Sequence, residues 1–259
     1  MPPKENTQPE PAQREPLVCI NVPEAQAIRE PHTLLELTGA AKNHRASRIA
    51  NEFEQGLQFI KKYPKSVTFY GSSRFQYDNP HYKDAYKLAQ KLSKSGYAIV
   101  TGGGPGIMEA ANRGAKEAGG PSVGLNIQLP REQIINPYVT DSLSFYYFFS
   151  RKTTLSFSAE AYIFYPGGYG TLDEFFEIIT LIQTHKIHRV PVFLVGSEFW
   201  LPLDRYMEEF LQVRHGAIEE ADLHLYIITD DHEEVLRAIE QTPPRQLEEA
   251  GRNTTAVDS

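Results

Sequence analysis

Short apolar segments alternate with longer amphipathic ones between residues 67 and 240, and few folds accept that order. Strands are expected at residues 67–71, 97–101, 122–127, 161–165, 190–195 and 225–229. Helices are expected at residues 81–95, 106–119, about 150–159, 171–185, 200–213 and 231–240. Continuous apolar strands separated by helices indicate a parallel sheet that is covered on both faces. The sequence therefore predicts an α/β fold, a Rossmann-like doubly wound parallel sheet with helices on both faces.

The two ends of the chain depart from this pattern. Residues 1–31 are rich in proline and polar side chains, so they bury too little apolar surface to offset the entropy lost on ordering. We expect them to form a disordered tail. Residues 32–241 are expected to form a single domain, in which the apolar pattern of residues 32–62 predicts one or two helices leading into the core. Residues 242–259 are predicted to be a flexible C-terminal tail.

The charge and composition exclude several classes of function. The chain has 26 Lys plus Arg and 33 Asp plus Glu, a formal net charge of -7, which argues against binding nucleic acid through its backbone. A single cysteine, Cys19, cannot form an internal disulfide and fits a reducing compartment. No stretch approaches the roughly 20 apolar residues that cross a bilayer, and the N-terminus lacks the apolar segment of a signal peptide. We therefore expect a cytoplasmic protein that binds neither nucleic acid nor membranes.

Three of the predicted strands end in turns that contain glycine. These turns are Gly71-Ser-Ser-Arg74, Thr101-Gly-Gly-Gly-Pro-Gly-Ile-Met-Glu109 and Tyr165-Pro-Gly-Gly-Tyr-Gly-Thr171. Glycine lets the backbone approach a ligand closely, and a helix that starts directly afterwards points free N–H groups at an anion. Glycine is also favoured in any strand-to-helix turn, and neither the P-loop pattern nor the dinucleotide spacing is present. Because two such turns are expected at neighbouring strand ends, a small phosphorylated ligand is the favoured interpretation.

The helix predicted after the third turn places a carboxylate beside the expected phosphate. Its apolar stripe, which turns Asp173, Glu174 and Glu177 away from much of the core, consists of Leu172, Phe175, Phe176, Ile179 and Ile182. Glu174 has two interpretations. It could close a capping box by bonding back to the Thr171 N–H, or it could act on the atom next to the phosphate-bearing group. Further apolar positions on this helix, Ile178 and Leu181, could supply part of a subunit contact.

Two adjacent cations, Arg151 and Lys152, follow the aromatic run at residues 145–149. They either form a solvated face or bind a ligand, since the planar fork of arginine suits phosphate or a purine edge. The aromatic side chains are expected in the core rather than as a platform for a base. Cations also gather at the end of the helix predicted at residues 171–185, where they complement its carbonyl groups: His185, Lys186, His188 and Arg189. No histidine spacing matches a metal-binding motif, so neither a metal nor a cofactor is expected.

The nine residues from Pro166 to Glu174 resemble the PGGxGTxxE signature of the Lonely Guy (LOG) family, whose members also carry the older name of possible lysine decarboxylases. The turn at residues 101–109 and the pair Arg151-Lys152 are similar to the other two motifs of that family, and the resemblance covers roughly residues 64–240. It implies a phosphoribohydrolase, which cleaves the N-glycosidic bond of a nucleoside 5′-monophosphate, AMP or a cytokinin riboside monophosphate, to a free base and ribose 5-phosphate. Asp173 replaces a second Glu of many plant-type members, and this departure bears on the identity of the base.

The same resemblance implies roles for individual residues. Arg151 and Glu174 would be the catalytic pair, and Gly168, Gly170 and Thr171 would hold the 5′-phosphate. The other residues expected to bind substrate or phosphate are Gly71, Ser72, Gly103, Gly104, Gly106, Met108, Glu109, Lys152, Gly167 and Tyr169. The family also implies a homodimer.

An oxocarbenium-like transition state would need a carboxylate near C1′, and we expect Glu174 to supply it while orienting or deprotonating the attacking water. Arg151 would steady the substrate or the leaving base. Decarboxylation is disfavoured because it normally needs pyridoxal phosphate on a Schiff-base lysine, which the motifs do not mark. Two alternatives stay open: a non-catalytic binding protein resembling molybdenum-cofactor carriers, and a nucleotide-sensing regulator with negligible turnover.

Overall fold

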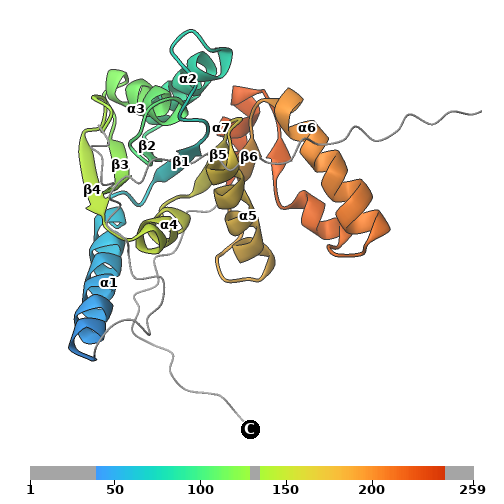
Figure 1. Cartoon of the computed structure of the whole chain (residues 1–259). Coiled ribbons are helices and arrows are strands. Elements are labelled where there is room, and N and C mark those ends of the chain that lie inside the picture. The colour runs from blue at the N-terminus through green and yellow to red at the C-terminus, as the bar shows by residue number, and fades with distance from the viewer. Residues whose placement is uncertain (1–38, 129–134, 243–259) are drawn as a thin grey trace, which may run out of the picture.

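The computed structural model describes residues 39–128 and 135–242 of the 259-residue chain. The tail predicted at residues 1–31, with Cys19, lies outside the described residues, as does the C-terminal tail from residue 243 onward. Figure 1 shows a sheet at the centre of the molecule with helices on either side of it.

Seven parallel strands form that sheet, and their order along it is β4-β3-β2-β1-β5-β6-β7. The strands are β1 (Ser66–Tyr70), β2 (Ala98–Thr101), β3 (Ser122–Ile127), β4 (Asp141–Phe145), β5 (Ala161–Phe164), β6 (Val192–Leu194) and β7 (Ile227–Ile228). The chain runs from β1 outward through β2, β3 and β4, and then returns to the other side of β1 for β5, β6 and β7. This order confirms the predicted doubly wound sheet. In such sheets ligands bind beyond the carboxyl ends of the strands where the direction of winding reverses, which here is between β1, β2 and β5.

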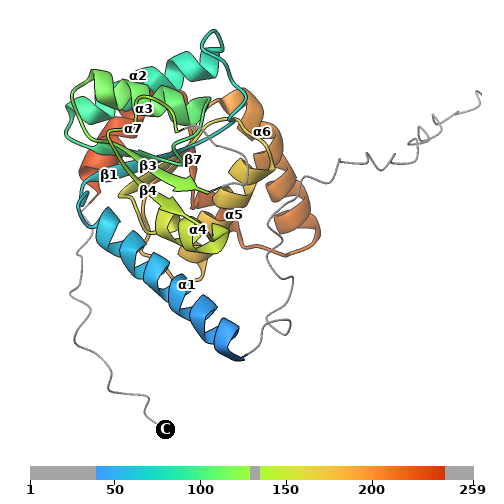
Figure 2. The ribbon, with the colours of Figure 1, turned by 60° about the vertical axis from the view of Figure 1, so that its left-hand side comes forward.

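Helices cover both faces of the sheet, as predicted. One face carries α2 (Pro80–Lys94), α3 (Ile107–Glu117) and α7 (His232–Gln241), and the other carries α1 (Gly39–Ile60), α4 (Phe148–Ser156), α5 (Tyr169–Gln183) and α6 (Ser197–Tyr206) (Figure 2). Side chains that alternate along each strand supply two cores, because successive residues point to opposite faces. On β1, Phe69 packs under α2 and α3, whereas Tyr70 faces the side of α4 and α5.

The edge strand β4 is the element that the sequence pattern did not predict. In the run from Asp141 to Phe145 only Phe145 is fully buried, and the other positions alternate between half-buried and exposed. A search for continuous apolar runs passes over such a strand, because an edge strand buries only one side. Its first residue is held from outside the sheet, since the Tyr63 hydroxyl donates a hydrogen bond of 2.6 Å to Asp141 Oδ2.

The helix predicted at residues 200–213 is longer and less regular than expected. It begins as α6 at Ser197, includes Pro202, and continues beyond Tyr206 as a π-helical segment, η2 (Met207–Arg214). A short 3-10 helix, η3 (Glu220–His224), follows before β7. Trp200 anchors α6 in the core, where its ring is fully buried and its Nε1 donates to the Val195 carbonyl at 3.1 Å.

A single helix, α1, occupies most of the segment predicted as helical at residues 32–62, of which residues 32–38 lie outside the described residues, and it packs against α4 and β4. The Glu52 carboxylate accepts hydrogen bonds from the backbone N–H groups of Tyr146 at 2.8 Å and Tyr147 at 3.2 Å. These two residues connect β4 to α4. The first helix thereby fixes the start of the helix that carries Arg151.

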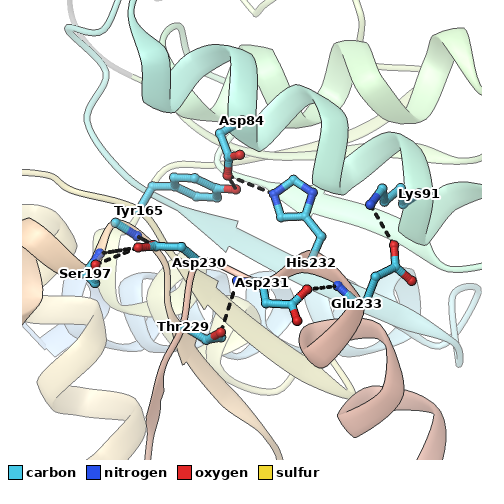
Figure 3. A network of polar contacts seen from close by, with 10 residues as sticks. Asp84, Lys91, Tyr165, Ser197, Thr229, Asp230, Asp231, His232 and Glu233 are labelled. Atoms are coloured by element: carbon cyan, nitrogen blue, oxygen red, sulfur yellow. Dashed lines mark hydrogen bonds and ion pairs between the residues drawn. The ribbon is translucent and has the colours of Figure 1, made fainter.

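Figure 3 shows a polar network on the face of α2 and α7. Asp84 of α2 accepts a hydrogen bond of 2.7 Å from the hydroxyl of Tyr165, which follows β5, and lies 3.0 Å from Nε2 of His232 at the start of α7. Asp230 accepts a bond of 2.6 Å from the Ser197 hydroxyl at the start of α6. The network joins the helices of the C-terminal half to the sheet.

Candidate active site

The three glycine turns of the sequence meet at the carboxyl ends of β1, β2 and β5. Ser72 links them through its backbone: its N–H donates to the Pro166 carbonyl at 3.0 Å, and its own carbonyl accepts from the Ile107 N–H at 3.0 Å. The first turn is therefore bonded to both of the others. Main-chain bonds of this kind fix the turns relative to one another whatever their side chains are.

Several of the glycines are required by this close packing. Gly106 has a φ of 71°, and a Cβ atom there would meet the backbone of Ser72 and Ser73. At Gly71 a Cβ atom would lie 2.8 Å from the side chain of Ile107. Gly168 and Gly170 differ, because a Cβ atom on either would meet no atom within 4 Å. These two glycines face open space, so packing does not explain them.

A cleft of about 940 Å³ opens above the three turns. The predicted site residues that line it are Gly71, Ser72, Met108, Arg151, Gly167, Gly168, Tyr169, Gly170, Thr171 and Glu174. The sheet thus brings together side chains that lie more than 100 positions apart in the sequence. The volume suits a ligand of the size of a nucleotide.

The remaining predicted site residues lie around the cleft without lining it. Gly103 and Gly104 are buried, and the Gly104 carbonyl accepts a hydrogen bond of 3.0 Å from Asn136 Nδ2. Gly106 packs against the first turn, as described above. The Glu109 carboxylate accepts a bond of 3.0 Å from the Tyr82 hydroxyl, and Lys152 forms ion pairs with Asp173 at 2.6 Å and with Glu177 at 3.4 Å.

The N-terminus of α5 points unpaired amides at the cleft. The helix begins at Tyr169, and among the described residues the N–H groups of Tyr169 and Gly170 donate to no acceptor. Gly168 precedes the helix and offers no side chain as a cap. Free amides and the positive end of the helix dipole attract an anion, so this end of the cleft is suited to a phosphate.

The capping-box interpretation of Glu174 is wrong, because α5 starts two residues before Thr171 and the Thr171 N–H donates to the Gly168 carbonyl at 3.0 Å. Glu174 instead lies on the cleft wall, and its Oε2 atom is buried without a hydrogen-bond partner. Burial raises the pKa of Glu174 to about 7, although the nearby cations Arg151 and Lys152 act in the opposite direction. Glu177 and Asp173 add to the rise. A carboxyl group in this state can exchange a proton near neutral pH.

Arg151 does not belong to a solvated face, which was the other interpretation of the adjacent cations. Its Nε donates to the Leu125 carbonyl at 2.7 Å, and its guanidinium lies against Gly102, where any side chain would collide with it. Burial lowers the pKa of Arg151, while Glu174 and Tyr70 raise it. The guanidinium is thus held at the floor of the cleft beside the carboxyl group of Glu174.

Two features of the floor were missed from the sequence. Gly102 makes room for the guanidinium, and the run of three glycines was a signal that could have indicated it. Tyr70 also lines the cleft, yet as the last residue of an apolar strand it carries no sequence pattern that marks a ligand site. At the rim, Arg74 and Phe199 also face the cleft.

The apolar stripe of α5 differs from the predicted one. Phe175, Ile178 and Ile182 are fully buried, whereas Phe176 is 37% exposed. Ile178 therefore belongs to the core and cannot make the subunit contact considered for it.

Over residues 39–128 and 135–242, no helix combines the length and apolar character needed to cross a bilayer. The same residues hold no group of three or more His, Cys, Asp or Glu arranged as a metal site.

Comparison with known proteins gives relatives that share most of this fold. The family model described as "Possible lysine decarboxylase" matches residues 108–239, just over half of the chain. A probable cytokinin riboside 5′-monophosphate phosphoribohydrolase of Oryza sativa subsp. japonica is 32% identical over 162 residues, which span 61% of this chain and 72% of the relative. A cytokinin riboside 5′-monophosphate phosphoribohydrolase of Arabidopsis thaliana is 28% identical over 207 residues, spanning 78% of this chain and 94% of the relative. A second rice relative of the same kind is 35% identical, but the match spans 53% of its length.

Solved structures with the same architecture include the structural genomics target TM1055, which is 26% identical and has a TM-score of 0.51. That match covers 68% of this chain and 99% of the other. The molybdenum cofactor binding protein of Rippkaea orientalis is 22% identical, with a TM-score of 0.52 over 68% of this chain and 96% of the other. At that identity the likeness extends to the fold alone.

Proposed function

Since the chain belongs to the family described as possible lysine decarboxylases, the Lonely Guy family of the sequence motifs, we propose that it hydrolyses the N-glycosidic bond of a nucleoside 5′-monophosphate. The products would be the free base and ribose 5-phosphate. The observation that carries this proposal is the buried, unpartnered Glu174 carboxyl group on the wall of a cleft that ends at the free amides of α5. AMP and cytokinin riboside monophosphates are the candidate substrates.

The phosphate would bind at the amides of Tyr169 and Gly170. Binding energy gained there, away from the reacting bond, would align the sugar and lower the entropy cost of the reaction. Glu174 lies one helical turn further along α5, about 5 to 6 Å along the axis. A ribose whose 5′-phosphate occupies the helix start would therefore extend toward this carboxyl group.

Glu174 would assist the attack of water on C1′. The water adds its oxygen to C1′, the bond to the base nitrogen breaks with its electron pair passing to the base, and the proton of the water passes to the Glu174 carboxylate. A carboxyl group with a pKa of about 7 can accept that proton and afterwards supply one to the base at neutral pH. Its ionised form would also stabilise positive charge on the sugar.

Arg151 would act on charge rather than on protons, since a guanidinium stays protonated. It is held by the Leu125 carbonyl at 2.7 Å, which leaves its remaining N–H groups available to a ligand. We propose that these groups steady the negative charge that develops on the leaving base.

The name "possible lysine decarboxylase" does not match the residues of the cleft. Such a reaction normally needs pyridoxal phosphate on a lysine, and no lysine is found among the described residues that line the cleft. Lys152, which is next to Arg151, is instead paired with Asp173 and Glu177. The cleft therefore does not fit that cofactor, and hydrolysis is the better supported reaction.

A panel of nucleoside 5′-monophosphates tests the proposal by chromatographic measurement of free base. We expect at least one purine nucleotide to be cleaved, and Glu174→Gln to bind it while releasing base at least about 100-fold more slowly. Glu177→Gln, one turn away on the same helix and outside the cleft lining, is the matched control and should keep turnover within about threefold of wild type. Near-normal turnover in Glu174→Gln would remove the assignment of this residue.

The alternative is a non-catalytic carrier of a phosphorylated ligand or a nucleotide sensor. The fold shared with the molybdenum cofactor binding protein is compatible with it. Retention of both Arg151 and Glu174 favours the enzyme. The same panel decides between them, because a carrier or sensor would bind a ligand without releasing base.

We also propose that the protein is a cytoplasmic homodimer. Exposed aromatic side chains on α4 and α5 support a subunit contact on this side of the molecule, since Phe148, Phe149 and Phe176 are 63%, 46% and 37% exposed. Light scattering after size-exclusion chromatography measures the mass directly. A mass of one chain at micromolar concentration would contradict the dimer.

A further inference from the structure

The hydroxyl group of Tyr70 is a buried polar group that the fold leaves unused. Tyr70 ends β1 at the point where the winding of the sheet reverses, and only 7% of the residue is exposed. Its Oη atom has no hydrogen-bond partner among the described residues. The ring itself is firmly placed, because it stacks on Phe164 with centroids 4.7 Å apart.

An unpaired buried hydroxyl destabilises the protein, so its presence indicates a role other than packing. A buried donor without a partner loses its hydrogen bonds to water and gains none in return, and a phenylalanine would fill the same space without that cost. Packing therefore explains the ring of Tyr70 but not its hydroxyl.

A second unpaired polar atom lies in the same cleft. Glu174 Oε2, on α5, is also buried without a partner, and both residues line the cleft beside Arg151. Tyr70 and Glu174 interact electrostatically, and with Arg151, Glu177 and Tyr162 they make up the charged and titratable groups around the phenol. Two residues that line the same cleft, one from a strand and one from a helix, thus each carry a buried polar atom that no described residue satisfies.

The chemistry of the pair defines what fits between them. Burial, followed by the charge of Glu174, raises the pKa of Tyr70 well above its usual value, so the phenol stays protonated and can donate. The Glu174 carboxylate can only accept. A ligand hydroxyl satisfies both, because it accepts from one group and donates to the other. A phosphate oxygen would satisfy the phenol but would be repelled by the carboxylate.

We propose that the Tyr70 hydroxyl donates a hydrogen bond to a ribose hydroxyl of the bound nucleotide, with Glu174 as the acceptor on the other side, and so selects this nucleotide over an analogue that lacks that hydroxyl. This inference rests on the proposed function, since it places the sugar between the α5 amides and the floor of the cleft. It makes Tyr70 a specificity-determining residue. A site that pairs a substrate hydroxyl discriminates strongly against an analogue that lacks it, because its own polar groups then stay unpaired.

Rates of base release from AMP, 2′-deoxy-AMP and 3′-deoxy-AMP test the inference in wild type and Tyr70→Phe. Wild type should cleave the analogue that lacks the contacted hydroxyl with a kcat/KM about 10- to 100-fold below that of AMP. In Tyr70→Phe the kcat/KM for AMP should fall about 10-fold and that for the analogue should change little. The ratio of kcat/KM for AMP to kcat/KM for the analogue should therefore fall about 10-fold. The two deoxy analogues show which hydroxyl is bound.

Tyr165→Phe is the matched control. It removes a phenol hydroxyl from the end of the neighbouring strand β5, on the opposite face, where that hydroxyl is bonded to Asp84. The ratio of kcat/KM for AMP to kcat/KM for each deoxy analogue should be the same in Tyr165→Phe as in wild type.

Thermal unfolding separates a structural role from a ligand role. Without ligand, Tyr70→Phe should unfold at the same temperature as wild type or at a higher one, because it removes an unpaired buried group. A lower unfolding temperature, or an unchanged ratio in Tyr70→Phe, overturns the inference while leaving hydrolysis intact. If wild type neither binds AMP in calorimetry nor releases base from any of the three nucleotides, the proposed function fails and the inference fails with it.

Discussion

Replacing Glu174 by Gln should stabilise the protein, and the gain should depend on pH. The side chain is buried against the cleft wall with Oε2 unpaired, and burial is the main reason that its pKa rises from 4.5 to about 7. In the unfolded chain the same carboxyl group would titrate near its ordinary value. The folded protein therefore binds this proton more tightly than the unfolded chain does.

The direction of the pH effect follows from that difference. Below pH 4.5 the group is protonated in both states, and its charge costs the fold nothing. As the pH rises from 4.5 to about 7 the unfolded chain loses the proton while the folded protein retains it, so the free energy of unfolding decreases. Above about pH 7 the loss is complete, in total about 2 to 3 kcal/mol at 1.36 kcal/mol per pH unit, where the lower figure allows for solvent near the carboxyl group.

Glutamine has the size of the protonated side chain and no charge at any pH. We therefore expect the free energy of unfolding of Glu174→Gln to exceed that of wild type by less than about 1 kcal/mol at pH 5 and by about 2 to 3 kcal/mol at pH 8. For a domain of this size the larger value corresponds to a rise in Tm of roughly 4 to 12 °C. Urea unfolding followed by circular dichroism at both pH values gives the two differences directly.

Glu177→Gln provides the comparison on the same helix. It removes a carboxylate that lies 3.4 Å from Lys152, so it should not stabilise the protein at pH 8. The reasoning is refuted if Glu174→Gln and wild type differ by the same amount at pH 5 and pH 8, or if the variant is the less stable protein at pH 8.

Two further substitutions test the scaffold. Asp84→Asn should lower the free energy of unfolding by about 1 to 2 kcal/mol at pH 7 in urea, since it weakens the bonds to Tyr165 and His232. Burial alone would raise the pKa of Asp84, but these hydrogen bonds lower it overall, so the wild-type advantage should persist at pH 5 and vanish as the pH falls well below 3.8; a pH-independent difference would contradict this. Gly106→Ala should cost roughly 2 to 4 kcal/mol, because φ is 71° and the new Cβ meets the backbone of Ser72 and Ser73. Gly119→Ala, at a φ of 81° with no atom within 4 Å of the new Cβ, should lower the free energy of unfolding by only about 1 kcal/mol. Thermal unfolding of both variants measures the two differences, and equal losses of stability would show that the contact at Gly106 is unimportant.

The central strands could be predicted from the sequence because burial on both faces leaves a largely apolar run. The four residues of β5 and the five of β1 are all buried, and both strands were identified within one residue of their observed ends. The edge strand β4 alternates and was missed for that reason. The π-helical continuation after α6 has no signal in the spacing of its side chains.

The candidate site shows a similar division. Gly168, Gly170 and Glu174 could be recognised because a turn and the helix that follows it are local in sequence. The glycines Gly71 and Gly106 were predicted as ligand contacts, and the structure adds a second reason for their small size, because a Cβ atom on either would meet the neighbouring turn. That reason depends on distances between separate segments. The unpaired hydroxyl of Tyr70 is likewise visible only when its neighbours in space are known.

The hydrogen bonds from Tyr146 and Tyr147 to Glu52 have a practical consequence for anyone who shortens this protein. The matched family segment begins at residue 108, and a shortened chain that starts at Ser66 would still contain all seven strands. It would nevertheless lose the carboxylate that braces the entrance to α4, and two amides would be left bare four and five residues before Arg151. If the shortened chain loses activity, the reason would then be that the guanidinium of Arg151 is held less firmly, even though no residue of the cleft itself had been removed.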